Sequence, residues 1–292
     1  KVHVYDCISD YYDVRLKHAR NKILKSYKNF SSTEEMLENQ KVLDKAITSF
    51  KPEIVIHLAA QAGVRYSLEE PRVYLNSNIT GTFNIIELAY KSKVDHLIIA
   101  SSSSVYGANK NIPYCETDKS QNQLSIYAAT KKATESIAHS YSNLWKLPIT
   151  MLRFFTVYGP WGRPDMAMFI FIDKILNEQP VPIFNNGKMK RDFTFIDDIV
   201  SGTLSAIDKN YNKEIFNLGN NKSEKLMKVI NLIENELGKK AIVDFQPMQE
   251  GDVKESYADI DYSTKKLNYK PITSVEEGIP KLIDWYRKYY KK

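Results

Sequence analysis

The chain has no glycine before Gly63, although it is 292 residues long. A glycine-rich turn that seats a phosphate on a helix amino terminus is therefore excluded from this first stretch. Only two cysteines occur, Cys7 and Cys115, far apart and without a partnering histidine motif. Their spacing excludes a disulfide framework and a zinc site, so we expect no metal, and such cysteine usage is typical of a reducing cytosol.

Long hydrophobic runs and blocks of like charge are also missing. No apolar stretch approaches the roughly 18 residues that a membrane span requires, and the first residues carry no signal-peptide pattern. We therefore expect a cytoplasmic protein without membrane contact. The net charge of +6 is spread along the chain rather than gathered in a tail, so we expect no nucleic-acid partner. A basic surface still attracts a polyanionic substrate such as a nucleotide diphosphate.

What the chain does contain is an alternation of short apolar runs and longer helical patterns. The runs "VHVY", "EIVIHLAA", "HLIIAS" and "ITMLRFF" are separated by helical patterns near residues 14–28, 71–91 and 127–145. This alternation predicts an α/β fold, a parallel sheet with crossover helices that is typical of nucleotide binding. Further along, helical stretches mix with short strands such as "EIFNLG" and "AIVDF", which predicts a smaller second lobe.

A tyrosine and a lysine four residues apart, Tyr127 and Lys131, indicate a proton-transfer site. This spacing places both side chains on one helix face, where the ammonium can lower the phenol pKa and make the phenolate a general base. The spacing recurs at 106–110 and 262–266, but only Tyr127 opens a helical stretch after an apolar strand that ends in serines, Ser102 among them. Open α/β sheets present catalytic groups at such carboxyl ends of strands. The alternative is an ordinary surface pair on an amphipathic helix.

Asp6 ends the first apolar run. An acidic residue at the end of the second strand of a dinucleotide-binding fold accepts hydrogen bonds from the adenosine ribose hydroxyls and favours NAD over NADP. The alternative is a plain turn aspartate.

Several segments in order resemble the extended short-chain dehydrogenase/reductase family, and within it the NAD-dependent nucleotide-sugar epimerases, most closely bacterial UDP-glucuronate 4-epimerases. The resemblance covers nearly the whole chain. It rests on "DCISDYYDVRLKHAR", "HLAAQAGVRYSLEEP", "NSNITGTFNIIE", "SSSSVYG", "RFFTVYGPWGRPDMAMF", "KRDFTFIDDIV" and "MQEGDV". It implies a Rossmann-like doubly wound parallel sheet at residues 1–155, also receiving about 192–218, that binds NAD. Residues 156–292 would mainly form the smaller α/β lobe that binds the nucleotide sugar.

The resemblance also implies roles for individual residues. Tyr127 would remove the proton from the sugar 4-hydroxyl, Lys131 would tune Tyr127 and hold the nicotinamide ribose, and Ser102 would hydrogen-bond the same hydroxyl. The implied cofactor-binding positions are Asp6, Ala59, Ala60, Gln61, Asn78 and Tyr158, together with Tyr127 and Lys131, and the implied substrate-binding positions are Ser103, Ser104, Thr156, Arg163, Arg191, Gln249 and Asp252. Duller interpretations remain: Arg191 pairs with Asp192 or Asp197, Asn78 caps a helix, and Asp252 forms a turn.

The residue types at the positions of Ser103 and Ser104 distinguish the branches of this family. A 4,6-dehydratase has an acidic pair directly after the hydroxyl residue, and a decarboxylase has a glutamate just before the Val-Tyr-Gly; this chain has serines there. The remaining chemistry is hydride removal from C4, rotation of the 4-keto sugar and hydride return, which is 4-epimerisation. We expect conversion of UDP-glucuronate to UDP-galacturonate, with its carboxylate met by Ser103, Ser104, Thr156 and Arg163. A neutral or N-acetylated UDP-hexose is the alternative substrate.

Two departures from the family bear on activity. The first strand, helix and glycine-rich turn of the family do not occur in these 292 residues, and "FSSTEEMLEN" at 30–39 replaces a strand that usually ends in aspartate, with Met36 at that place. We expect this strand to be frayed or absent. A competing hypothesis is therefore an inactive fragment, or a protein that only binds nucleotide sugar. The resemblance also implies a homodimer that pairs through helices near 79–91 and 127–145, although their apolar faces could equally pack on the sheet.

Overall fold

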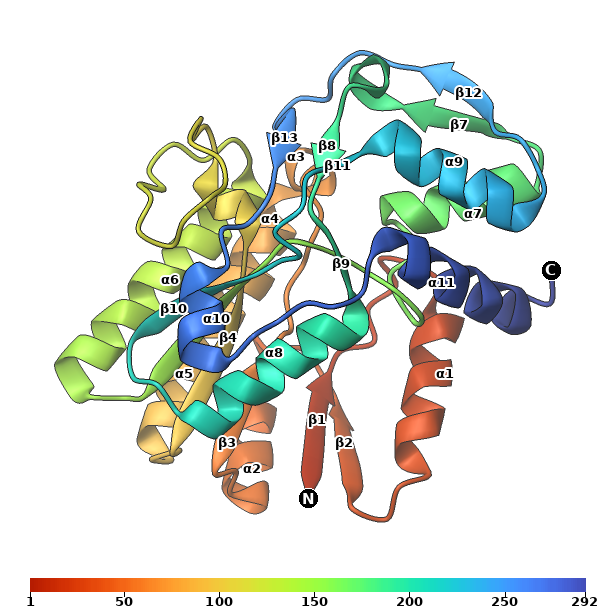
Figure 1. Ribbon diagram of the computed structural model, residues 1–292. Helices are drawn as coiled ribbons and strands as arrows, with labels where there is room; N and C mark the ends of the chain where they lie inside the picture. The colour runs from red at the N-terminus through yellow and green to blue at the C-terminus, as the bar shows by residue number, and fades with distance from the viewer. The chain divides into compact units, whose positions relative to one another are not determined.

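The structure is a computed structural model that describes residues 1–292 and divides into two compact units (Figure 1). Unit 1 comprises Lys1–Gly107, Gln123–Leu152 and Ala206–Ile215, and unit 2 comprises Ala108–Asn122, Arg153–Ser205 and Phe216–Lys292. Strands β5 (Ile149–Phe154) and β10 (Glu214–Leu218) and helix α8 (Ile196–Lys209) pass from one unit to the other. Each unit has a hydrophobic core of its own.

Unit 1 begins with two parallel strands. Strand β1 (Val2–Asp6) pairs with β2 (Phe30–Glu34), and α1 (Val14–Lys25) lies between them in sequence. The expectation that the strand within 30–39 is frayed or absent is therefore wrong. Its sequence is polar, but the main-chain ladder to β1 holds it, and His3 adds side-chain hydrogen bonds to Ser31 (2.8 Å) and Thr33 (3.0 Å) across the pair.

A four-stranded sheet follows, with the strand order β10-β5-β4-β3. Strand β3 (Ile54–His57) runs parallel to β4 (His96–Ser102), as the alternating pattern predicts. Every residue of β4 is buried, because helices α5 (Thr82–Lys91) and α6 (Ile126–Trp145) contribute apolar side chains to the same core. Helix α2 (Gln40–Phe50), which was not predicted from the sequence, also joins this core through Leu43 and Ile47.

The helical pattern at 71–91 is not one regular helix. After the short helix α3 (Tyr66–Glu69), the chain forms α4 (Pro71–Tyr74), a π-helical segment η1 (Leu75–Gly81) and then α5. A π-helical turn widens the helix and redirects the side chains within it, and such turns often occur at functional sites. Here the segment brings Asn78 into the buried interior of unit 1.

A groove of about 630 Å³ runs along strand edges of unit 1. Strand β1 ends the two-stranded sheet and β3 ends the four-stranded one, and residues of both strands line the groove. Several of the apolar side chains of these strands are exposed, among them Val2 (57%) and Ile56 (42%). The main-chain groups at these edges have no partner strand on that side.

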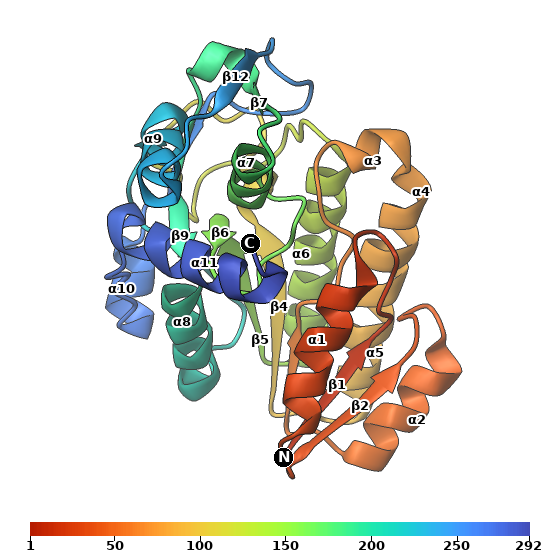
Figure 2. The same cartoon turned by 90° about the vertical axis from the view of Figure 1, so that its right-hand side faces the viewer.

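Unit 2 packs three helices around a second core. Helices α7 (Ala167–Leu176), α9 (Leu226–Leu237) and α11 (Val275–Tyr290) supply most of its side chains. Figure 2 shows these three helices near one another. Its strands form small sheets: β6 (Thr156–Tyr158) with β9 (Phe193–Phe195), β7 (Pro180–Ile183) with β12 (Ile242–Phe245), and β8 (Lys190–Arg191) between β11 (Glu224–Lys225) and β13 (Glu255–Ser256). The short helices η2 (Ser103–Tyr106) of unit 1, and η3 (Phe184–Gly187) and α10 (Asp261–Leu267) of unit 2, complete the chain.

Candidate active site and nucleotide-binding residues

The carboxyl end of β4 and the first turns of α6 bring the predicted proton-transfer residues together in unit 1. Ser125 caps α6 by accepting a hydrogen bond from Ala128 N (3.1 Å), which places Tyr127 in the first turn and Lys131 one turn later. Lys131 Nζ donates to Ala100 O on β4 at 2.8 Å. Ser102, two residues after Ala100, ends the strand and is 8% exposed.

The electrostatics of Lys131 follow from its burial. The side chain is 5% exposed, and loss of hydration lowers the pKa of Lys131 to about 8, while the negative charge of Glu135 partly opposes this shift. The buried imidazole of His57 hydrogen-bonds Thr82 at 2.8 Å, and burial, aided by the nearby Lys131 charge, lowers the pKa of His57 to about 3. His57 is therefore neutral at neutral pH, and Lys131 is the cation of this region.

Asn78 is completely buried and binds the main chain after β3. Its amide accepts from Gln61 N at 2.8 Å and donates to Gln61 O at 2.9 Å, and it also donates to Thr130 Oγ1 on α6 at 3.0 Å. These bonds imitate a strand pairing and fix the segment that contains Ala59 and Ala60, both half-buried. The alternative that Asn78 caps a helix is wrong, because Asn78 lies inside the π-helical segment.

Asp6 lies at the end of β1, where its carboxylate accepts a hydrogen bond from Ile8 N at 2.8 Å. The local geometry is thus that of an aspartate turn. Its role in cofactor binding stays a prediction, since the exposed carboxylate of such a turn is also accessible to a ligand hydroxyl.

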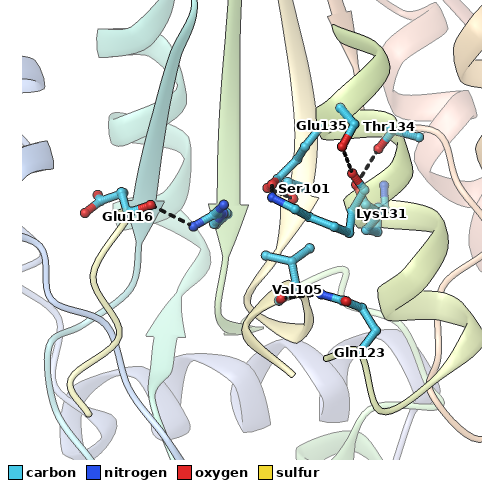
Figure 3. Close-up of polar contacts among 10 residues, drawn as sticks. Ser101, Val105, Glu116, Gln123, Lys131, Thr134 and Glu135 are labelled. Carbon is cyan, nitrogen blue, oxygen red and sulfur yellow. Dashed lines mark hydrogen bonds and ion pairs between the residues drawn. The ribbon is translucent and has the colours of Figure 1, made fainter. Parts of the chain in front are cut away.

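Ser103 and Ser104 begin η2, directly after β4, and both are half-buried. The main-chain N–H of Ser104 donates to Ser102 Oγ at 3.2 Å. Gln123 holds the end of η2 by donating to Val105 O at 2.7 Å, as Figure 3 shows. The three serines are therefore fixed together at one end of β4.

Thr156 and Tyr158 lie on β6 in unit 2. Thr156 is half-buried and its N–H donates to Asp192 O at 3.1 Å. Tyr158 points into the core of the unit, where its hydroxyl donates to Ser274 O at 3.3 Å and burial raises its pKa. Any contact of Tyr158 with a cofactor would therefore be made by its main chain, which leads into Gly159 at φ 145°.

Arg163 has a carboxylate partner within its own loop. Its Nε donates to Asp165 Oδ1 at 3.0 Å, and its Nη2 donates to Asp165 Oδ2. The two side chains are 30% and 28% exposed, so the pair is accessible to water. Part of the charge that the sequence analysis reserved for a substrate carboxylate is already balanced by Asp165.

Arg191 and Asp252, both predicted to bind substrate, lie together in unit 2. Arg191 Nη2 donates to Asp252 Oδ1 at 2.7 Å, and Nη1 donates to Lys190 O at 2.8 Å. The alternative pairing of Arg191 with Asp192 is wrong: Asp192 is completely buried and accepts from Thr194 Oγ1 and from the main-chain N–H groups of Asn220, Asn221 and Ala258. Gln249, also half-buried, lies on the same loop as Asp252.

Two buried carboxylates, Glu135 and Asp192, lie close to these residues and were not predicted from the sequence. Glu135 follows Lys131 by four positions, so the spacing that selected Tyr127 and Lys131 continues by one further helical turn. Asp192 follows Arg191 directly, but nothing in the sequence shows that its partners come from residues 194, 220, 221 and 258.

Residues 12–219 match the model of a family described as the NAD dependent epimerase/dehydratase family. The chain belongs to that family. The resemblance stated from the sequence is thereby confirmed, as is the α/β fold with parallel sheets. None of the helices of this epimerase/dehydratase has the length and apolar character that crossing a bilayer demands, and no three metal-binding side chains gather in one place.

Relatives and a solved structure resemble this chain over nearly its whole length. The protein CapI of Staphylococcus aureus is 46% identical over 98% of this chain and 91% of its own length. A UDP-glucuronate 4-epimerase of Thermodesulfobacterium geofontis is 43% identical over 96% of this chain and 86% of its own. The crystal structure of UDP-glucuronic acid 4-epimerase from Bacillus cereus, in complex with UDP-glucuronic acid and NAD, matches 99% of this chain and 91% of that chain, with a TM-score of 0.94 and 33% identity.

The residues of unit 1 suit part of an NAD molecule. Lys131 offers a buried ammonium beside Tyr127, and Gly63 takes φ 105° directly after the Gln61–Asn78 contact, which lets main chain approach a ligand closely. Asp6, at the end of β1, has an exposed carboxylate of the kind that accepts hydrogen bonds from the adenosine ribose. The assignment of these residues to the nicotinamide and adenosine ends of NAD stays a prediction, and no glycine-rich turn for the pyrophosphate lies among residues 1–62.

Proposed function

We propose that this chain catalyses NAD-dependent 4-epimerisation of UDP-glucuronate to UDP-galacturonate. The observation that carries this proposal is the arrangement of Tyr127 and Lys131 on α6 against the end of β4, where Ser102 lies. The serines at 103 and 104 support it further, because no carboxylate there is available for a second proton transfer. The epimerase function of the 43%-identical relative supports the same reaction and substrate.

In the proposed reaction Tyr127 accepts the proton of the sugar 4-hydroxyl while Ser102 hydrogen-bonds the same oxygen. The Lys131 ammonium stabilises the phenolate form of Tyr127, so the base is available near neutral pH. When bound, NAD supplies the chemistry that accepts the C4 hydride and gives it back. The sugar is a 4-ketone between these steps, and after it rotates Tyr127 returns the proton to the oxygen, which leaves an inverted C4 and no net oxidation.

For the substrate we propose that Arg191 binds the diphosphate and that Asp252 and Gln249 lie near the uridine ribose. An arginine is suited to this role because its fork of N–H groups matches phosphate oxygens. The ion pair with Asp252 holds the guanidinium in place before binding. Because Asp165 already balances Arg163, we propose that hydroxyls of Ser103, Ser104 and Thr156 are the main donors to the substrate carboxylate.

The paired Arg163 also favours the second candidate substrate, a neutral or N-acetylated UDP-hexose. A loop whose arginine is neutralised by Asp165 discriminates less strongly for a charged sugar. We would measure the turnover of UDP-glucuronate and of UDP-glucose by wild type and by Arg163→Ala, to test whether Arg163 selects the charged sugar. If the ratio of the two rates is unchanged by the substitution, Arg163 does not recognise the carboxylate.

The decisive experiment incubates the protein with UDP-glucuronate, UDP-glucose and their N-acetyl counterparts, and identifies products by NMR. Two forms are compared: the chain as described, and a fusion in which the amino-terminal segment of a 46%-identical relative precedes Lys1. Absorbance of co-purified nucleotide reports whether each form retains NAD. A C4-inverted product that disappears in Tyr127→Phe supports the proposal. No inverted product from either form contradicts it.

We also propose that the protein is a homodimer that pairs through α5 and α6. An aromatic cluster on these helices supports this: Phe83, Tyr90 and Trp145 are 39%, 39% and 46% exposed, and Tyr141 contacts Trp145 at 4.5 Å between ring centroids. Light scattering should show that Trp145→Glu is monomeric. Ile272→Glu is the control, because Ile272 is 82% exposed and lies in unit 2. A Trp145→Glu protein with unchanged mass would contradict the dimer.

We propose that the protein is located in the cytosol, because both of its cysteines are free thiols and the cytosol keeps thiols reduced.

A further inference from the structure

Three consecutive residues at the end of β4 each make a different contact. Ala100 O accepts from Lys131 Nζ at 2.8 Å, Ser101 Oγ donates to Glu135 Oε1 at 2.6 Å, and Ser102 Oγ accepts from Ser104 N at 3.2 Å. Figure 3 shows Lys131 and Glu135 approaching the strand from the same side of α6. The strand end that carries Ser102 is thus connected to the helix that carries Tyr127 by two polar contacts.

The carboxylate of Glu135 is unusual because it is buried. Its side chain is 3% exposed, whereas its lysine partner Lys132, with Nζ 3.1 Å from Oε2, is 33% exposed. A buried charge is costly unless it is well paired and hydrogen-bonded. An ordinary helix-surface pair would keep both charges in water, but this one places the carboxylate against β4, beside the proposed active site.

We propose that Glu135 is a positioning residue of the active site, which fastens α6 to the carboxyl end of β4 and keeps the buried Lys131 ammonium charged. The first role rests on the Ser101 contact, and the second on the charge of Glu135 next to Lys131. The consequence for turnover rests on the proposed epimerase function, whereas the consequence for Lys131 itself does not.

The electrostatic role follows from what surrounds Lys131. Burial lowers the pKa of Lys131 to about 8, and Glu135 is the group that raises it against burial. His57 on β3 is neutral at neutral pH, because its pKa is lowered to about 3. The other elements packed on α6 carry few charges near Lys131: Glu69 on α3 and Arg72 on α4 are exposed, and Glu87 on α5 pairs with Lys91. Burial lowers the pKa of His96 on β4, and the phenols of Tyr66, Tyr74, Tyr90 and Tyr106 are uncharged in this range.

Removing the charge therefore makes Lys131 lose its proton at lower pH. In Glu135→Gln the amide can still accept from Ser101, but the negative charge is gone. Ser101→Ala makes the complementary change, because it removes the hydrogen bond to Glu135 and keeps the negative charge. The matched control is Glu234→Gln: Glu234 is also buried on a helix, accepts from Ala241 N and pairs with Lys240 at 2.7 Å, but lies in unit 2.

Thermal unfolding between pH 6 and 9 tests the charge without any cofactor. At pH 6 Lys131 is charged in wild type and must be charged without compensation in Glu135→Gln. Above about pH 8 the wild-type lysine is itself losing its proton, so the charge of Glu135 no longer matters. The Tm deficit of Glu135→Gln should therefore be largest at pH 6 and shrink toward pH 9, whereas the deficits of Ser101→Ala and Glu234→Gln should stay constant.

The pH profile of turnover tests the same role in catalysis. Loss of activity at alkaline pH reports deprotonation of Lys131, and in Glu135→Gln this loss should begin about one pH unit lower. Ser101→Ala should lower turnover at every pH without moving the alkaline limb. Glu135→Asp keeps the charge on a shorter side chain, so it should restore the wild-type pH dependence with a lower rate, and it replaces Glu135→Gln if that variant does not fold.

A Tm deficit of Glu135→Gln that is the same at every pH, together with an unmoved alkaline limb, would overturn the proposal. If no form of the protein turns over a UDP-sugar, the epimerase function fails, but the pH dependence of the Tm deficit still decides whether Glu135 acts on Lys131. The two failures are therefore distinguishable.

Discussion

Arg191 and Asp252 are 61 residues apart in the chain, and their side chains form an ion pair with 2.7 Å between Nη2 and Oδ1. Strand β13 pairs in parallel with β8 and brings the loop of Asp252 to Arg191. The Arg191 side chain is 15% exposed, and hydrogen bonds to Asp252 and to the main-chain oxygens of Lys190 and Lys254 hold its guanidinium in one orientation. A preorganised arginine loses little freedom when it binds a phosphate.

Arg191→Gln should weaken the binding of UDP by about 10- to 100-fold, because it removes charge-assisted hydrogen bonds to the diphosphate. Isothermal titration of UDP into the protein measures this effect. Lys190→Gln is the control, since Lys190 is the neighbouring cation and pairs with Glu255 instead. Equal UDP affinity of wild type and Arg191→Gln would remove Arg191 from the binding site.

Asn78→Ala should lower the free energy of unfolding by about 2–4 kcal/mol. The substitution leaves both the N–H and the C=O of Gln61 buried without their partner, and each unsatisfied group costs about 1–3 kcal/mol. Urea unfolding monitored by circular dichroism gives the value. Asn84→Ala should cost less, because Asn84 is also buried but makes a single recorded bond, to Leu37 O. Similar losses in the two variants would show that Asn78 does not hold the main chain.

The buried Asp192 should make stability depend on pH. Burial raises the pKa of Asp192 to about 6 in the folded protein, against about 3.9 in an unfolded chain. Its contribution to stability is therefore full below pH 4 and is lost as pH rises through about 6, a change on the order of 3 kcal/mol. Urea unfolding of wild type and Asp192→Asn from pH 4 to 7 tests this.

The amide of Asp192→Asn does not titrate, so the difference in unfolding free energy between the two proteins should change over this range. The variant should also be less stable throughout, because an amide cannot accept all four recorded donors. Thr194→Val, which removes one donor and keeps the carboxyl group, should retain the wild-type slope. Parallel curves for wild type and Asp192→Asn would contradict the raised pKa.

Gly278→Ala should destabilise the protein although it introduces a better helix former into α11. Alanine gains about 1 kcal/mol over glycine in a helix, but a Cβ at this position would lie 2.1 Å from the Tyr158 hydroxyl oxygen. Overpacking of a core costs about 1–3 kcal/mol, and the Tyr158 bond to Ser274 O is lost as well. Scanning calorimetry measures Tm. In a Tyr158→Phe background, Gly278→Ala should lower Tm by less, because the hydroxyl oxygen is gone. An equal loss of Tm would show that the added Cβ does not clash with this hydroxyl.

The sequence predicted the strands that are apolar and the helices that carry the catalytic spacing, because burial and helical period are visible in a short window. It failed for β2, whose polar residues 30–34 are held by a main-chain ladder and by His3. It also failed at 75–81, where a π-helical turn interrupts a continuous amphipathic pattern.

The sequence predicted only those site residues whose positions follow from the pattern of a single helix or strand. Tyr127, Lys131 and Ser102 follow from helical spacing and from the end of an apolar strand, and the structure brings them to adjacent elements. Arg191 and Asp192 each have a partner within two residues, but their other partners, and those of Asn78, lie 17 to 66 residues away in sequence. Such pairs depend on tertiary packing, so no local pattern shows which partner a buried amide or carboxylate has.

The unpaired edges of β1 and β3 along the unit 1 groove have a consequence for how the two sheets of this unit can be connected. Open strand edges with apolar side chains are templates on which another chain can add a strand, and natural proteins usually protect them with charge, bulges or a covering segment. Here Val2, Ile54 and Ile56 are 57%, 39% and 42% exposed along those strands. A single strand that hydrogen-bonds to both edges would cover these side chains and join the two sheets of unit 1 into one.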